Sequence, residues 1–174
     1  MSNETGQPLR TGGGPKPGVI LSGLLTAIDR NEADTVGRLL REGTDPNLVD
    51  SDGRTPLMHA VTQGRDELVK LLLQNKANPD AQDKTGFSAL HFAAQNFRAF
   101  AGKALLHAGA QVDLKDRFGN TALWRAVFHS RGRGEMIEML LKSGADRFIK
   151  NNSDVSPIDL AQTIANYNVK QFFA

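Results

Sequence analysis

Short runs of apolar residues, spaced as on one face of a helix, alternate with polar turn residues along most of the chain. In the clearest stretch, Leu57, Ala60 and Val61 form one side of a predicted helix that ends at Gly64. The next apolar run predicts a second helix with a wide apolar stripe. A helix of this kind is expected to contact neighbours on two sides, which indicates a structure built from helix pairs. This second helix is predicted over about 66–75, and its stripe consists of Leu68, Val69, Leu71, Leu72 and Leu73.

The same helix pair recurs at a nearly constant interval. Four copies of one short motif begin at Thr55, Ser88, Thr121 and Ser156, so that successive copies start 33, 33 and 35 residues apart. Their sequences are TPLMHA, SALHFA, TALWRA and SPIDLA. A fixed period of this size predicts stacked units that each bury an apolar face only against their neighbours. The question of function therefore concerns a surface rather than an enclosed pocket.

Each motif is preceded by a residue suited to a tight turn. Gly53, Gly86 and Gly119 stand where the turn requires a positive φ, and Asp154 stands at this place in the last copy. Thr55 then offers a hydroxyl to cap the following helix, which begins with a proline. These features predict a hairpin loop before every helix pair except the first.

The period and the motif resemble those of ankyrin-repeat proteins, and the resemblance covers residues from about 20 to 174. It implies an all-α repeat solenoid: stacked helix-turn-helix pairs with projecting β-hairpin loops, called fingers below, and a concave surface lined by the first helix of each pair. We expect five units, at about 20–49, 50–82, 83–115, 116–150 and 151–174, of which the first and last are degenerate caps. The three units between them are called the first, second and third full units.

Composition adds constraints but does not change this prediction. The chain has 174 residues, a formal net charge of +2 and no cysteine, which excludes disulfides, a thiol nucleophile and cysteine-ligated zinc. The sequence contains neither an apolar run long enough to span a membrane nor a secretory signal. Residues 1–18 are rich in glycine and proline, so we expect a flexible tail followed by one repeat domain over 19–174. We expect a cytoplasmic protein.

Aromatic residues break the pattern in the middle of the chain. By their place in the repeat, Phe87 and Phe118 lie on fingers and Phe128 lies near the exposed end of a first helix. Trp124 occupies the position of the family's usual histidine, which His91 fills one unit earlier. Because ankyrin fingers are mostly polar, these rings are candidates for an exposed apolar patch, a feature that usually marks an interface. The alternative is that one or two rings fold back over the base of a hairpin.

The third full unit also differs in length and charge. Two extra residues lengthen the connection between its helices, where Arg131 and Arg133 lie among glycines. This loop is either a contact for phosphate or an acidic partner, or a tolerated surface insertion, and we favour the insertion because it costs little. Residues 20–82 are rich in carboxylates, whereas the third full unit is rich in basic residues. This change from an acidic to a basic end would orient a partner protein of complementary charge. Nucleic acid is a weaker interpretation because the basic residues are confined to one unit. They are Lys115, which directly precedes this unit, and Arg117, Arg125, Arg131, Arg133, Arg147 and Lys150.

The sequence indicates no catalytic, metal or cofactor site. Its histidines, His59, His91, His107 and His129, lie at unlike positions in three units and lack the paired spacing of zinc sites. The resemblance implies that His91 is a structural hydrogen-bonding residue at the base of a hairpin. The sequence contains neither of the phosphate-binding motifs G-x-x-x-x-G-K-[ST] and G-x-G-x-x-G. We therefore expect a protein that is not an enzyme.

We predict a non-catalytic module that binds another protein through its concave face and fingers. A more specific form of this hypothesis is an inhibitor or immunity-type partner of a toxin or enzyme. The alternative is a regulatory subunit that binds an anion or nucleic acid through the basic cluster of the third full unit. The sequence indicates neither a membrane nor a small-molecule substrate as a partner. The predicted partner-binding residues are Asp52, Arg54, Lys84, Phe87, Gln95, Asn96, Arg117, Phe118, Asn120, Trp124, Phe128, His129, Arg131 and Arg133.

Overall fold

The computed structural model describes residues 17–165 and 167–173. The flexible tail predicted over 1–18 lies outside these residues, except for Pro17 and Gly18, which begin the first helix. The helices of the described residues are α1 (Pro17–Asp29), α2 (Ala33–Arg41), α3 (Pro56–Gln63), α4 (Asp66–Gln74), α5 (Ala89–Gln95), α6 (Ala99–His107), α7 (Ala122–His129), α8 (Glu135–Lys142), α9 (Pro157–Thr163) and the 3₁₀ helix η1 (Val169–Phe173).

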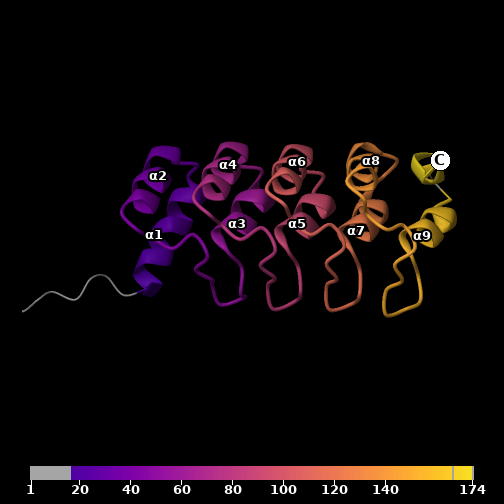
Figure 1. Cartoon of the computed structure of the whole chain (residues 1–174), viewed down its shortest axis with the longest axis horizontal. Coiled ribbons are helices and arrows are strands. Elements are labelled where there is room, and N and C mark those ends of the chain that lie inside the picture. The colour runs from indigo at the N-terminus through magenta and orange to yellow at the C-terminus, as the bar shows by residue number, and fades with distance from the viewer. Residues whose placement is uncertain (1–16, 166, 174) are drawn as a thin grey trace, which may run out of the picture.

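The helices form an extended row of pairs, which confirms the all-α repeat solenoid. The first helices of the pairs, α1, α3, α5, α7 and α9, lie side by side, and α2, α4, α6 and α8 form a second layer above them (Figure 1). The fingers that link successive pairs project away from both layers (Figure 1). In the last unit the short η1 takes the place of a second α-helix. Within residues 17–165 and 167–173, the first unit is thus a helix pair with no finger before it, and the last unit is a pair with a shortened second helix.

The predicted helix signals act as expected at the start and end of α3. The Thr55 hydroxyl accepts a hydrogen bond from the Met58 amide at 3.3 Å, and Pro56 occupies the first turn. Gly64 ends the helix with a φ of 69°, a conformation that an L side chain rarely adopts. Thr121 and Ser156 cap α7 and α9 in the same way as Thr55 caps α3.

One continuous apolar core runs through all the units. Because α3, α5 and α7 each lie between two neighbours, an interior unit is covered on both sides, whereas a terminal unit is covered on one. At the C-terminal end, Val169 and Phe173 of η1 are buried and close the core. The core leucines of the interior units, Leu57, Leu72, Leu90, Leu105, Leu123 and Leu140, are all at most 1 % exposed.

The fingers are tight loops rather than regular β-hairpins, and no strand occurs in residues 17–165 and 167–173. Gly53, Gly86 and Gly119 have φ values of 79°, 80° and 76°, and Asp154 has 61°, so the predicted turn positions are confirmed. Each finger makes one backbone bond to the next, which is too few for a strand ladder. These bonds run from Lys84 N to Asp52 O (2.9 Å), from Arg117 N to Thr85 O (3.0 Å) and from Asn152 N to Phe118 O (2.9 Å).

A second row of hydrogen bonds joins the units where the second helices lead into the fingers. Asn47 Oδ1 accepts from the backbone amide of residue 78 at 2.7 Å, and Asp80 Oδ1 accepts from that of Gln111 at 2.8 Å. At the next step, the Asp113 carboxylate accepts from the amide of Asp146 at 3.2 Å, so that two carboxylates lie close together. Burial raises the pKa of Asp113 above its usual value, and the charge of Asp146 adds to this effect.

Asp113→Asn is therefore expected to stabilise the protein at pH 7, by less than about 1 kcal/mol because the site is only partly buried. An amide oxygen can still accept the hydrogen bond, as Asn47 does. Since folding raises the pKa of Asp113, the ionised carboxylate destabilises the fold above that pKa, and this cost is absent below the ordinary value of 3.8. The gain should shrink as the pH falls from 7 towards that value, as measured by urea unfolding.

Asp80→Asn provides the matched control, because Asp80 faces Gln111 instead of a carboxylate. This substitution should bring no gain at either pH. An equal gain in both variants, or a gain in Asp113→Asn that does not change with pH, would contradict the assigned cause.

Candidate functional site

An aromatic cluster lies on α7 of the third full unit. The rings of Trp124 and Phe128 are stacked, with centroids 5.2 Å apart and an interplanar angle of 13°, as residues four apart on a helix allow. His129 meets Phe128 edge-on at 5.0 Å. Phe128 is 56 % exposed, whereas the corresponding residues of α3 and α5 are Thr62 and Gln95. This part of the predicted patch is therefore present, and its outer ring is in solvent.

Phe87 does not belong to that cluster, so the expectation that it is an exposed finger ring is wrong. It is only 9 % exposed and packs against Phe92 and His91, with centroid distances of 5.2 and 5.5 Å. The guanidinium of Arg125 covers its other side at 4.5 Å. Phe87 therefore folds back over the base of its hairpin, which was the alternative. Phe118, at the tip of the next finger, is 63 % exposed.

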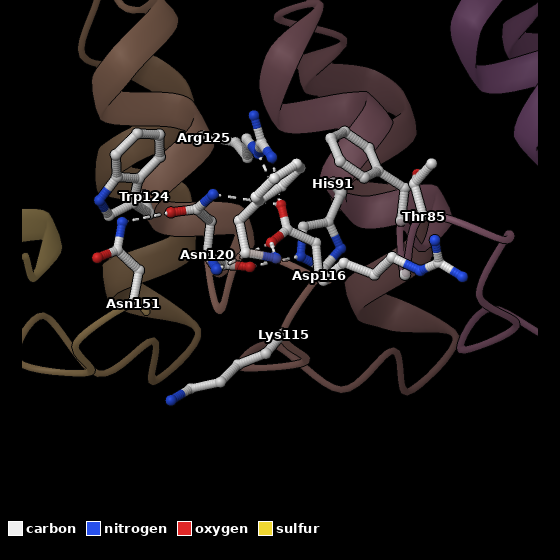
Figure 2. Close-up of polar contacts among 12 residues, drawn as sticks. Thr85, His91, Lys115, Asp116, Asn120, Trp124, Arg125 and Asn151 are labelled. Carbon is white, nitrogen blue, oxygen red and sulfur yellow. Dashed lines mark hydrogen bonds and ion pairs between the residues drawn. The ribbon is translucent and has the colours of Figure 1, made fainter. Parts of the chain in front are cut away.

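A buried ion pair holds the base of the third full unit (Figure 2). Asp116, whose side chain is fully buried, accepts from Arg125 Nε at 3.0 Å and also from the terminal nitrogen of the same guanidinium. Its other oxygen accepts from the backbone amides of Phe118 (2.8 Å) and Asn120 (3.0 Å), which shapes the turn. Arg125, one of the basic residues counted in the cluster, is therefore neutralised inside the protein.

Asn120 links three units and is not available to a partner, contrary to the prediction. It is 5 % exposed, and its backbone oxygen accepts from Nε2 of His91 in the preceding unit at 3.1 Å. Its side-chain oxygen accepts from Asn151 of the following unit at 2.7 Å (Figure 2). Burial lowers the pKa of His91, so this residue acts as a neutral hydrogen-bonding group, as the resemblance implied.

Trp124 occupies the repeat position at which, one unit earlier, His91 takes part in the cap of α5. His91 Nδ1 accepts from the amide of Ser88 at 3.2 Å and so completes a reciprocal cap. The indole of Trp124 has no acceptor, so at this point it cannot replace the histidine. Its Nε1 is buried and has no hydrogen-bond partner among the described residues. The substitution therefore weakens a structural contact and places a large ring beside Phe128.

The longer loop of the third full unit is occupied mainly by contacts within the protein. The Arg133 guanidinium lies 3.8 Å from the centroid of the Phe97 ring, and its Nε donates to Ser130 O at 3.3 Å. In earlier units the arginine at this place donates to a carbonyl of the preceding unit, Arg65 to Asp29 O and Arg98 to Thr62 O. Through its contact with Phe97, Arg133 likewise connects its unit to the preceding one. This favours the structural interpretation of the insertion. Arg131 remains exposed.

The other predicted residues lie along the fingers and the end of α5. Asp52, Lys84, Arg117 and Asn96 are exposed, and Gln95 is partly buried. Arg54 Nε lies 3.5 Å from a carboxylate oxygen of the buried Asp83, and its guanidinium covers the Phe92 ring at 5.2 Å, so it too connects units. The structure leaves Asp52, Lys84, Asn96, Arg117, Phe118, Phe128 and Arg131 exposed, and it partly exposes Gln95, Trp124 and His129. It uses Arg54, Phe87, Asn120 and Arg133 in internal contacts, although Arg133 is exposed as well.

Sequence reasoning missed a shallow hollow beside Phe128. It has a volume of about 420 Å³ and lies between the end of α7 and the segment after α9, where Ile164 and Tyr167 line it together with Phe128 and Arg131. No repeat signal predicts Tyr167, because it follows the last regular α-helix. The Asp116–Arg125 pair was predictable in principle, since Asp50 and His59 have the same nine-residue spacing and lie 2.8 Å apart.

Metal and membrane sites are not indicated by the described part of the chain. No group of histidine and acidic side chains in it could hold a metal ion. None of its helices is both long and apolar enough to cross a bilayer.

A comparison with known families gives one match, to the model described as ankyrin repeats (3 copies), over residues 24–116 and 77–151. No curated protein matches the chain. The family is typically a non-catalytic interaction module that binds other proteins. With its motif period, its stacked helix pairs and a family match over well more than half of its length, the chain belongs to the ankyrin-repeat family.

Proposed function

We propose that this chain is a non-catalytic module that binds a partner protein through the concave face of α7 and the neighbouring fingers. The observation that carries the proposal is the exposed Phe128, which is stacked on Trp124 where α3 and α5 present polar side chains. Apolar rings at such positions gain free energy when a partner removes them from water. We call Trp124, Phe128, His129 and Arg131 the α7 surface.

The fingers extend this surface on one side. Arg117 and Phe118 form the tip of the finger that precedes α7, and both are exposed. Lys84 lies on the finger before it, where its backbone amide bonds to the neighbouring finger, and its exposed side chain has no hydrogen bond or ion pair within the described residues. A partner that covers the α7 surface and these tips would contact two adjacent units. Such a contact is compatible with a protein–protein interface of standard area.

The alternative of an anion or nucleic-acid site has less support, because the basic cluster is not assembled on one surface. Arg125 is paired with Asp116, Lys150 is paired with Asp154 at 2.9 Å, and Arg133 is stacked on Phe97. High affinity for nucleic acid needs many free cations along one track. The inhibitor or immunity role stays a prediction that rests on the resemblance alone.

The test compares two exposed phenylalanines in affinity purification from the native host. Phe128→Ala should weaken recovery of the partner by about tenfold or more, the loss expected for an aromatic anchor of about 2 kcal/mol. Phe148→Ala is the matched control, because Phe148 is 66 % exposed but lies in the loop between α8 and the last finger. It should leave recovery unchanged. A partner retained by Phe128→Ala would refute the proposed surface.

A further inference from the structure

The hollow beside Phe128 combines an apolar wall with an exposed positive charge. Phe128 and Tyr167 are 56 % and 46 % exposed, and Ile164 lies between the end of α9 and Tyr167. The volume of about 420 Å³ is enough for one large side chain of a peptide, although not for an enclosed ligand. Arg131 lines the same hollow and is exposed.

The charge of Arg131 is not balanced within the described residues. No carboxylate there lies within ion-pair distance of its guanidinium, whereas Arg125 is paired with Asp116. The acids of the last unit are occupied elsewhere: Asp154 pairs with Lys150, and Asp159 accepts from the amide and hydroxyl of Ser156. Neither acid lines the hollow.

The positive charges of this surface also act on His129. Burial lowers its pKa below the usual value, and the charges of Arg125 and Arg131 lower it further. An anion bound against Arg131 would oppose part of that effect. The surface is thus complementary to a negative group next to an apolar one.

We infer that the segment bound by the α7 surface is an acidic peptide of the partner, which inserts an apolar side chain into the hollow and places a carboxylate against Arg131. The inference rests on the proposed function and adds the chemistry of the partner. Arginine forms two parallel hydrogen bonds with a carboxylate, and the apolar wall excludes water from one side of that contact. A nucleic acid fits less well, since one free arginine beside an apolar wall offers few phosphate contacts.

The chain contains its own reporter for this contact. Trp124 is the only tryptophan, and its ring is stacked on Phe128, which lines the hollow. Insertion of a side chain against Phe128 should change the indole environment. Binding can therefore be followed by tryptophan fluorescence of the full chain without a label.

The experiment titrates the full chain with short synthetic peptides of equal length, up to the millimolar range expected for a small contact area. The first peptide has glutamates on both sides of one phenylalanine, the second has lysines in place of the glutamates, and the third has alanine in place of the phenylalanine. A short single-stranded oligonucleotide is the fourth probe. The first peptide should bind in a saturable way and about tenfold or more tightly than the other three probes.

Two variants and one control locate the site. Arg131→Glu and Phe128→Ala should each weaken the first peptide by about tenfold or more. Lys103→Glu makes the same charge change in a different hollow, of about 350 Å³ between α6 and α8, and should have no effect. Circular dichroism should show an unchanged fold in all three, because each side chain is exposed.

Equal binding of the glutamate and lysine peptides, tighter binding of the oligonucleotide, or equal losses in Arg131→Glu and Lys103→Glu would overturn the inference. Binding of the purified partner to the same two variants distinguishes failure of this inference from failure of the proposed function. A partner lost with Phe128→Ala but retained by Arg131→Glu supports the α7 surface and refutes the acidic segment. A partner retained by both variants refutes the proposed function as well.

Discussion

Asp116→Ala is expected to lower the free energy of unfolding by about 3–5 kcal/mol, the cost of leaving a buried charge without its partner. Arg125, only 14 % exposed, would keep its guanidinium inside the protein with no carboxylate to neutralise it. The backbone amides of Phe118 and Asn120 would also lose their acceptor, so the turn of the finger would be weakened. Urea unfolding followed by circular dichroism measures the loss.

Two further variants distinguish the cost of the unpaired Arg125 charge from the cost of the weakened turn. Asp116→Asn keeps an oxygen that can accept from the turn amides, so its cost should come mainly from the unpaired Arg125. The double variant Asp116→Asn/Arg125→Leu reproduces the pair that the last unit contains, Asn151 and Leu160, where Asn151 accepts from the turn amides at 2.9 and 3.1 Å. It should recover most of the lost stability.

Asp50→Ala is the matched control at the same place in an earlier repeat. Asp50 and its partner His59 are 21 % and 24 % exposed, so water can solvate the histidine when the carboxylate is removed. Its loss should therefore be clearly smaller than that of Asp116→Ala. Equal losses at the two sites, or a double variant no more stable than Asp116→Asn, would show that burial of the Arg125 charge is not the cause.

Leu123→Ala is expected to lower the free energy of unfolding by about 2–5 kcal/mol, the range for a fully buried leucine. Leu123 is 0 % exposed in α7, which packs against α5, α8 and α9, so little can move to fill the cavity. Because each unit is stabilised by its neighbours, the loss should also reduce the stability of the last unit. Hydrogen exchange in α9 should therefore become faster in the variant.

Ile158→Ala makes a comparable change at the corresponding position of the last unit. Ile158 is only partly buried, and no further repeat covers it on the C-terminal side within the described residues. Its truncation should cost less than that of Leu123, since less apolar surface returns to water. An equal cost would contradict the view that interior units depend on two neighbours and the last unit on one.

Much of the fold follows from local features that the sequence displays directly. Gly53 and Gly86 mark turns with positive φ because other residues rarely adopt that conformation. Thr55 and the proline after it start a helix through a cap that involves residues close in the chain. Such signals depend on a few neighbouring residues. Their four copies, together with the apolar runs before the first copy, were enough to predict five units and the solenoid.

The candidate site was less predictable, because exposure depends on residues from other units. Phe87 and Phe118 both lie on fingers, yet one is 9 % and the other 63 % exposed. Phe87 follows its turn glycine, whereas Phe118 precedes its own, and the ring of Phe87 is covered by Phe92 of its own unit and by Arg125 of the next unit. In the same way, the side chain of Arg133 stacks on Phe97 of the preceding unit, a contact that the loop sequence alone does not show.

The sequence by itself determined the number of units, the turns and the positions of Trp124 and Phe128 on one helix, since these depend on spacing along the chain. Only the tertiary structure decided which charges and rings remain available to a partner. Asp116 and Arg125 neutralise each other, while Tyr167 comes from the last unit to form a hollow with Phe128 and Arg131. The physical reason is that a helix pair buries its surface against its neighbours, so the free surface of each unit is defined by the units on either side.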